Sequence, residues 1–362
     1  MARHGTRLVL GWLARITGHL IQALLVLWGA LALWFWPVQS TALRLAAAIG
    51  FAAFGIYALW RTRSRRVWLT FAALFVVLVL GWSTIRPRLD RDWRADVAVL
   101  PRAYIKGDVV RIVGVRDFDY RSQNDFTPRY VEREVRLSQL TGVDFYISYW
   151  MPGPIGHTFL SFMFEDQQPI SISIEARPEA HEGFAPVGSL FKQFELIYVV
   201  GQERDVVGVR TNHRGENVYL YRISTTDENA RRLFLIYLER LNQLAERAEF
   251  YHLLSNNCTL NIVRYANAVG PGAGFDIRHY LNGLFDGYLY QRSLLDTSVP
   301  FDDLRRSAWI NEVARGAGAA EDFPRRIRVQ LDNRNWTKGA LPPVTQHGDS
   351  PANASFQQRE EP

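Results

Sequence analysis

Long apolar stretches separated by short polar ones fill the first quarter of this 362-residue chain. They extend over about residues 16–36, 42–60 and 67–85. Each stretch is long enough to cross a hydrocarbon core of roughly 30 Å as a helix. A cleaved signal peptide has one apolar run of about 7 to 15 residues and therefore does not explain the pattern. We predict three transmembrane helices that form a membrane anchor over residues 1–89.

After the anchor, apolar positions recur at the shorter periods of a globular domain, which we predict over residues 90–332. Short apolar or alternating runs predict strands at 109–115, 143–149, the second part of 153–164, 170–177, 194–200, 206–211 and 218–224. Stripes of helical period predict helices at 227–247, 258–269 and 301–314, with Thr226 and Asn257 as N-caps of the first two. The expected fold class is α+β with an antiparallel sheet. Residues 333–362 are polar and poor in large apolar residues, so we predict a disordered tail.

Two neighbouring strands in this domain predict a hairpin whose register can be derived. Apolar and polar residues alternate along 170–177 at the period of a half-buried strand. If its isoleucines share the core face with the apolar residues of the preceding strand, the hairpin is centred on Asp166. Facing side chains have Cβ atoms about 4.5–5.5 Å apart, so His157 is expected to contact Glu175. The same register pairs Phe159 with Ser173 and Ser161 with Ser171.

Arginine residues are distributed unevenly around the three apolar stretches. Three precede the first stretch and four fill the loop after the second, whereas only Arg44 lies between the first and second. By the positive-inside rule, the N-terminus faces the cytoplasm and everything after the third stretch lies outside. Four arginines follow the third stretch, but long domains are translocated largely regardless of charge.

The same arginines account for the net charge of +6. Residues 1–89 hold ten arginines, no lysine and no acidic residue, so the rest of the chain carries a net charge of −4. The basic balance therefore reflects membrane topology, and we predict no binding to nucleic acid.

Cys258 is the only cysteine of the chain, and it lies where a polar segment gives way to a helical pattern. Unpaired N–H groups and a partial positive charge at a helix start favour thiolate over thiol and can hold an oxyanion. A small buried apolar residue is the alternative interpretation. In an oxidising compartment a lone cysteine cannot form an internal disulfide, so its thiol is either buried or reactive.

A catalytic hypothesis combines this thiol with the predicted hairpin. Cys258 would be the nucleophile, His157 the base and Glu175 the carboxylate that orients the base. Asn257 and Thr259 flank the thiol at the helix cap, where the oxyanion would be received. His252, close in sequence to Cys258, is a second candidate for the base.

Other polar residues give weaker indications. Arg177, Arg204 and Asp205 would either bind a phosphate or carboxylate of a substrate or form a structural ion pair. His181 and His213 have no evident partner in the sequence. The chain has no Gly-Lys phosphate loop and no Cys/His cluster with zinc spacing, so we predict neither a cofactor nor a metal. The glycines of 270–274 indicate the end of a helix.

Four motifs, in this order, resemble the bacterial Lnb-type N-terminal periplasmic domain: 156–162 (GHTFLSF), 172–177 (ISIEAR), 203–207 (ERDVV) and 257–259 (NCT). The resemblance covers most of residues 91–330. It implies a circularly permuted papain-like fold, a periplasmic location at the bacterial inner membrane, Cys258 as nucleophile and His157 as base. The characterised branch of the family is linked to lipoprotein N-acylation through an acylated cysteine. That branch carries membrane helices after the domain, whereas here three precede it.

These observations predict a multi-pass membrane protein that acts as a cysteine-dependent acyltransferase. It would form an acyl-thioester from a lipid-linked donor and use a membrane lipid or a lipoprotein as substrate. Two alternatives stay open: a cysteine amidase or peptidase of the cell wall, and a membrane-anchored binding protein without enzymatic activity.

Overall fold

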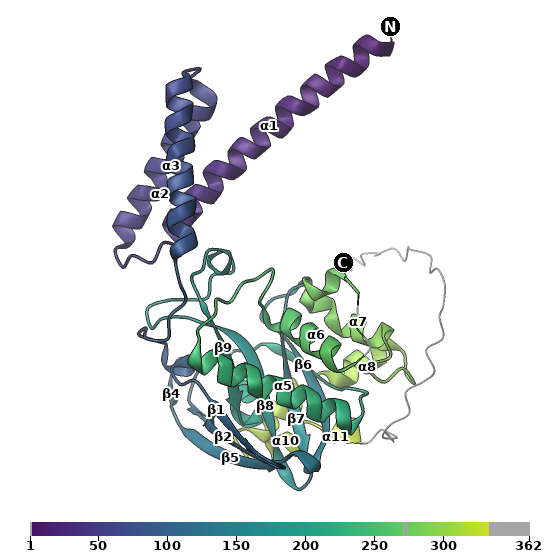
Figure 1. The fold of residues 1–362 in the computed structure, drawn as a ribbon. Coiled ribbons are helices and arrows are strands. Elements are labelled where there is room, and N and C mark those ends of the chain that lie inside the picture. The colour runs from purple at the N-terminus through teal and green to yellow at the C-terminus, as the bar shows by residue number, and fades with distance from the viewer. Residues whose placement is uncertain (1, 271, 273, 333–362) are drawn as a thin grey trace, which may run out of the picture.

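Three long apolar helices project from one side of a mixed α+β domain (Figure 1). This computed structural model describes residues 2–270, 272 and 274–332, so the predicted tail lies outside the described residues. The apolar helices are α1 (Ala2–Trp34), α2 (Thr41–Ile56), which continues in a π-helical turn (Tyr57–Arg61), and α3 (Arg65–Thr84). The segments 10–34, 41–61 and 65–84 are long and apolar enough to cross a membrane, in agreement with the three stretches expected from the sequence.

The centre of the domain is a largely antiparallel sheet. Its strands lie in the order β1 (Arg102–Lys106), β2 (Val109–Arg116), β9 (Glu195–Gly201), β8 (Gln167–Arg177), β7 (His157–Phe164), β6 (Leu140–Tyr149) and β10 (Asn217–Arg222). Strand β5 (Tyr130–Arg136) also pairs with β2, and β3 (Asp119–Tyr120) and β4 (Phe126–Thr127) form a separate small sheet. Strands β2 and β9 are parallel neighbours that meet only at Arg116 and Gly201. The predicted fold class, α+β with an antiparallel sheet, is confirmed.

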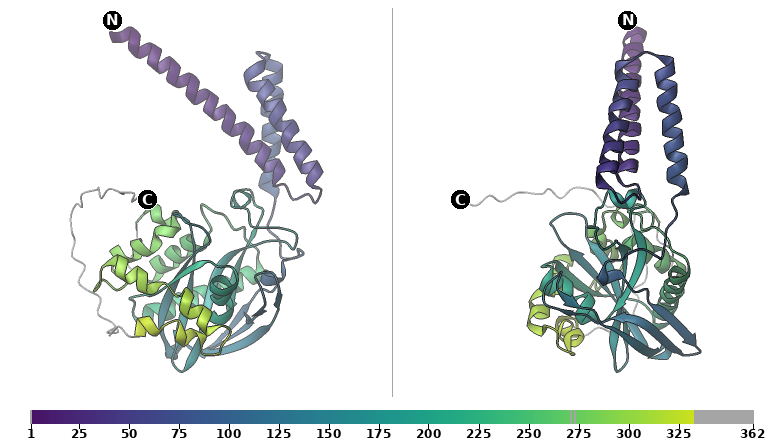
Figure 2. Two further views of the ribbon diagram at one scale, coloured as in Figure 1. Left: turned by 180° about the vertical axis from the view of Figure 1, so that it is seen from behind. Right: turned by 90° about the vertical axis from the view of Figure 1, so that its left-hand side faces the viewer.

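Helices cover both faces of this sheet, and each face has its own apolar core (Figures 1 and 2). The larger core lies under α5 (Asp227–Glu246), α6 (Cys258–Val269), α7 (Phe285–Gln291) and α8 (Phe301–Ala308). The smaller one lies under α4 (Glu203–Val206), α9 (Asn311–Ala317), α10 (Phe323–Arg326) and the π-helical turn Val209–His213. Helix α11 (Val329–Asp332) ends the described chain. Short 3₁₀ turns occur at Ala95–Val97, Leu137–Gln139, Gly188–Leu190, Ile277–His279 and Asn282–Leu284.

The hairpin formed by β7 and β8 lies in the middle of the sheet. Its register pairs Leu160 with Ile172 and Ser161 with Ser171, as derived from the sequence. The prediction of a half-buried strand is wrong, because β6 and β9 flank the hairpin and helices cover both of its faces. The serines on the polar face are therefore fully buried and hydrogen-bonded, with Ser161 Oγ 2.6 Å from Ser171 Oγ.

Two predicted elements take a different form. Residues 206–211 belong to α4 and a π-helical turn rather than to a strand, since a short apolar run does not distinguish a buried helix from a strand. The predicted helix 301–314 is divided into α8 and α9. Between them Trp309 forms a bridge with Tyr219 of β10, and Ile310 N–H donates to the Val218 carbonyl, so sheet pairing interrupts the helix.

Candidate active site

Cys258 is the first residue of α6, as the polar break in the sequence predicts. Asn257 is the N-cap, and its side-chain oxygen accepts a hydrogen bond of 2.9 Å from Leu260 N–H. This bond satisfies one of the N–H groups that a helix start leaves without a partner. The thiol is 2% exposed and belongs to the larger apolar core.

Two threonines fasten the start of α6 to strand β7. Thr158 Oγ1 and Thr259 Oγ1 form a buried hydrogen bond of 2.8 Å. The bond holds the start of α6 against the start of β7, where the His157 side chain also interacts with the Cys258 thiol. Of the two predicted helix-cap residues, Asn257 thus caps the helix, whereas Thr259 holds it against the sheet.

The surroundings of the thiol favour its ionised form. Burial acts to raise the pKa of Cys258, but the charge and hydrogen bond of His157, together with hydrogen bonds from Thr158, outweigh it. The result is a pKa of about 6, well below the usual value of a thiol. The N-terminal end of a helix acts in the same direction.

The other side of the His157 ring faces Ser173 and Glu175 on strand β8. His157 Nε2 lies 2.7 Å from Ser173 Oγ and 4.0 Å from Glu175 Oε1. The sequence predicts the neighbourhood of His157 and Glu175, and the structure brings both to the same end of the hairpin. The direct hydrogen-bond partner of the ring is nevertheless Ser173.

Glu175 takes part in a buried ion-pair network that continues away from the thiol. Arg210 Nη2 donates to Glu175 Oε1 at 2.8 Å, and Arg210 Nη1 donates to the Val206 carbonyl at 2.6 Å. Burial acts to raise the pKa of Glu175, but the Arg210 guanidinium, followed by His157, holds it well below the usual range. Glu175 therefore carries a negative charge next to the imidazole at any pH near neutrality.

Two chain segments close over the thiol. Asn282 Nδ2 lies 3.7 Å from Cys258 Sγ, and its Oδ1 accepts a hydrogen bond of 2.9 Å from Gly156 N–H, directly before His157. Gly283 N–H donates to the Pro154 carbonyl at 2.8 Å. A Cβ atom at Gly283 would lie 2.5 Å from the Pro154 backbone, so only glycine permits this approach.

Three other residues singled out in the sequence do not form a cluster. Asp205 pairs with Arg116 (Oδ1 to Nη2, 2.7 Å), and Arg204 pairs with Asp117 (Nη2 to Oδ2, 2.7 Å). Arg177 donates to the carbonyls of residues 97 and 98 and stacks on the ring of residue 93. Arg204 and Asp205 thus form ion pairs with partners outside the group, whereas Arg177 is held by carbonyls and an aromatic ring.

The remaining histidines of interest have other partners. His252 Nδ1 lies 2.9 Å from Ser255 Oγ, and burial lowers the pKa of His252. His213 packs against the ring of Tyr120, and His181 Nδ1 lies 3.8 Å from Glu179 Oε2. Within the described part of the chain, no group of three or more His, Cys, Asp and Glu residues is arranged to hold a metal ion.

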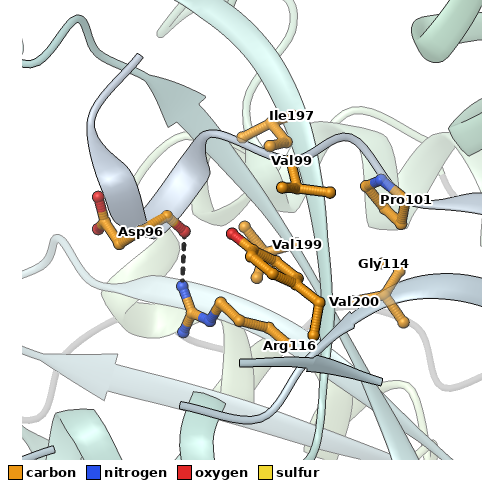
Figure 3. Close-up of a pocket in the computed structure, with 9 residues that line it drawn as sticks. Asp96, Val99, Pro101, Gly114, Arg116, Ile197, Val199 and Val200 are labelled. Atoms are coloured by element: carbon orange, nitrogen blue, oxygen red, sulfur yellow. Dashed lines mark hydrogen bonds between the residues drawn. The ribbon is translucent and has the colours of Figure 1, made fainter. Parts of the chain in front are cut away.

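A small cavity of about 10 Å³ lies elsewhere, where β2 and β9 diverge (Figure 3). Arg116 Nη1 donates to the Asp96 carbonyl at 3.0 Å beside it, and the remaining lining is mostly apolar. The volume is that of about one water molecule, too little for a substrate.

Sequence reasoning missed Ser173, Arg210 and Asn282. Ser173 was expected opposite Phe159, and its hydrogen bond to His157 runs diagonally between the strands. Arg210 lies in a segment expected to be a strand, and Asn282 lies far along the chain in a short turn. The serines that alternate with isoleucines in the hairpin were the one feature of the sequence that could have pointed to Ser173.

The chain was compared with protein families, curated proteins and solved structures. Residues 126–305 match the family model described as the Lnb N-terminal periplasmic domain. No curated protein and no solved structure gives a match. The matched segment contains His157, Ser173, Glu175 and Cys258, and all of them lie at one end of the central hairpin. Residues 126–305 therefore belong to an Lnb-type N-terminal periplasmic domain.

Proposed function

We propose that this protein is a membrane-anchored, cysteine-dependent acyltransferase with its domain on the periplasmic side of the bacterial inner membrane. The observation that carries the proposal is the Cys258 thiol, whose pKa lies at about 6 beside His157 at the start of α6. A thiolate at a helix N-terminus next to a histidine is the usual form of a nucleophilic cysteine. Family membership and the apolar helices support the periplasmic placement.

The first step transfers an acyl group to the thiol. The thiolate attacks the carbonyl carbon of an ester, and N–H groups at the start of α6 bind the oxyanion that forms. The carbon–oxygen bond to the leaving alcohol then breaks, and protonated His157 gives its proton to that alcohol. An acyl-thioester on Cys258 remains.

Ser173 and Glu175 prepare His157 for this role. When Ser173 Oγ accepts a hydrogen bond from Nε2–H of His157, Nδ1 is the ring nitrogen that remains to exchange a proton with the thiol. The negative charge of Glu175, 4.0 Å from Nε2, would attract the positive charge that the ring carries once it has taken the proton of the thiol. Glu175 thus remains the third catalytic candidate, acting through its charge, and Ser173 is a positioning residue.

The second step passes the acyl group to an acceptor. An amine, for example the N-terminus of a lipoprotein, attacks the thioester while His157 takes its proton, and the thiolate leaves. A membrane anchor favours a lipid-linked donor and a lipid-linked acceptor, because tethering raises the effective concentration of molecules confined to the same bilayer face. Residues 150–156 and 277–284 would have to separate to admit them, since the thiol is 2% exposed.

The intact mass of the full-length protein, purified from its own membranes, tests this chemistry. We expect a fatty-acyl adduct on the wild type that disappears after neutral hydroxylamine, which cleaves thioesters. Cys258→Ala should lack the adduct, and so should His157→Ala. Absence of any adduct from the wild type, even after incubation with phospholipid, would contradict acyl transfer and favour a cell-wall amidase or a binding role. An adduct that persists in Cys258→Ala would exclude this thiol as the acceptor.

A further inference from the structure

The globular domain is attached to the membrane helices by side-chain packing as well as by the chain itself. Phe191, which follows the 3₁₀ turn Gly188–Leu190, is buried against Ala32 of α1 and Leu78 of α3. Its ring lies 5.8 Å from that of Phe35 and 6.1 Å from that of Trp28. This turn of the domain therefore lies at the level where α1 and α3 end.

Lys192 strengthens the same attachment. Its Nζ donates to the carbonyls of Trp82 (3.0 Å) and Ile85 (3.2 Å), at the end of α3, and lies 4.3 Å from the centre of the Trp82 ring. The last carbonyls of a helix have no partner within the helix and attract a cation. Tryptophan and lysine at the end of an apolar helix are typical of the membrane–water interface.

The linker after α3 is held just as closely. Arg88 N–H donates to Glu195 Oε1 at 3.0 Å, Arg91 Nη1 donates to Glu179 Oε1 at 2.7 Å, and Arg94 N–H donates to the Pro178 carbonyl at 3.1 Å. These bonds fix the domain at a short and constant distance from the end of α3.

Two large apolar side chains are exposed to solvent beside this attachment. Phe184 is 49% exposed although it stacks on Phe194, with ring centres 5.7 Å apart, and Val187 is 46% exposed. Both precede Phe191 in the same loop. Exposed apolar side chains beside the ends of membrane helices are at the height of the lipid headgroups, where contact with acyl chains removes them from water.

A short path of contacts leads from this loop to the catalytic thiol. Lys192 Nζ lies 5.7 Å from the ring of Phe250, whose carbonyl accepts a hydrogen bond of 3.0 Å from Asn256 Nδ2, just before the helix cap. Leu254, in the same segment, is 54% exposed. In Figure 1, α6 lies in the half of the domain nearer to the apolar helices.

We infer that Phe184 and Val187 insert into the headgroup layer of the bilayer and that Leu254 brings the start of α6 to the same surface. The partner is the lipid bilayer on the side of the domain, and Arg86, which is exposed just after α3, favours anionic headgroups. This inference rests on the apolar helices and on the contacts of Phe191 and Lys192. It does not depend on the proposed acyl transfer, and its test does not use activity.

Single-cysteine labelling tests the inference, since Cys258 is the only native cysteine. In a Cys258→Ser background, Phe184→Cys, Val187→Cys and Leu254→Cys would each carry a polarity-sensitive fluorophore. The matched control is Ile105→Cys, because Ile105 is 46% exposed and lies on β1, in the half of the domain farther from the apolar helices (Figure 1). The full-length variants are reconstituted into vesicles of phosphatidylethanolamine and phosphatidylglycerol with or without spin-labelled lipid.

We expect emission at 184 or 187 to be shifted to the blue and quenched several-fold more by spin-labelled lipid than emission at 105. The same behaviour at 254 would support contact at the start of α6, and emission there equal to that at 105 would overturn that part. Equal emission and quenching at 184, 187 and 105 would overturn the inference. Phe184→Cys removes the stacking on Phe194 and could change the loop locally. Val187→Cys leaves that contact in place and so provides a second measurement at the same loop.

Discussion

At the scale of single residues, the reactivity of Cys258 depends on charges supplied by distant parts of the chain. His157 lowers the pKa of the thiol, and Oε1 of Glu175 lies 4.0 Å from Nε2 of His157. Arg210 keeps Glu175 ionised. Together with burial, these charges set the pKa of the thiol at about 6, so the thiolate predominates at neutral pH.

The first prediction concerns the pH dependence of thiol alkylation. The rate of Cys258 alkylation by iodoacetamide should rise with pH around a midpoint of about 6 in the wild type. Glu175→Gln removes the negative charge that lies beside the thiolate–imidazolium pair and stabilises its positive member, so the midpoint of the thiol should rise. A rise of about one pH unit corresponds to about 1.4 kcal/mol. Ser173→Ala should raise the midpoint as well, because the ring loses its hydrogen-bond acceptor.

Ser171→Ala is the matched control for this experiment. Ser171 lies on the same face of β8 as Ser173, is equally buried and bonds to Ser161 rather than to His157. Its substitution should leave the midpoint unchanged. A midpoint in Glu175→Gln equal to that of the wild type would contradict the role of Glu175.

The sequence allowed part of this site to be predicted. A helix cap and an alternating hairpin are local patterns, so the position of Cys258 after its cap Asn257 and the neighbourhood of His157 and Glu175 could be predicted from spacing. The catalytic roles of Cys258 and His157 came from the resemblance to the family and stay a proposal. The contact of Ser173 with His157 was not predicted, because a strand register defines only which residues face each other directly. A long side chain such as that of His157 also reaches a diagonal neighbour. The partner of Glu175 depended on the true conformation of residues 206–211, which an apolar run of this length does not determine.

At the scale of elements, the end of the described chain is fastened to the sheet by buried charges. Arg328, between α10 and α11, is 4% exposed and donates to Asp144 Oδ2 at 2.7 Å and to Glu203 Oε1 at 2.6 Å. Tyr146 of β6 donates to the same carboxylate of Glu203 at 2.7 Å. The network joins the last helices to β6 and α4, on the face of the sheet opposite to α6.

The second prediction is a large loss of stability in Arg328→Met. The change leaves the buried carboxylate of Glu203 without its cation, whereas Asp144 keeps its pair with Arg222, and an uncompensated buried charge typically costs about 3 to 5 kcal/mol. Urea unfolding of the detergent-solubilised protein, followed by circular dichroism, measures the difference. Arg325→Met is the control, because Arg325 makes only an exposed pair with Asp322 and should change stability by at most about 0.5 kcal/mol. Equal stability of the two variants would show that the buried network contributes little.

At the scale of the whole molecule, the orientation of the domain follows from the number of apolar helices. If all three apolar helices cross a membrane, the N-terminus and the domain lie on opposite sides of it. The arginine-rich loop between α2 and α3 favours the cytoplasmic side. The domain is then periplasmic, in agreement with the family description.

The third prediction tests this orientation with reporter fusions in a bacterial host. Alkaline phosphatase fused after residue 332 should be active, because it folds only in the periplasm, and a cytoplasm-dependent fluorescent protein at the same position should be dark. Fusions after residue 63, in the loop before α3, should give the reverse result. Active phosphatase at residue 63 and inactive phosphatase at residue 332 would reverse the assigned topology.

The attachment of the domain to α1 and α3 was beyond sequence reasoning, because it depends on where one loop meets two helix ends. This attachment limits how far the domain can move from the membrane helices. With Arg88, Arg91 and Arg94 bound to the domain so soon after α3 ends, the linker leaves no slack for the domain to swing outward. The lipid-linked molecules proposed above as substrates would then have to diffuse to Cys258 in the plane of the bilayer. Lateral diffusion and crowding in that plane, rather than the length of a flexible arm, then set which molecules it meets.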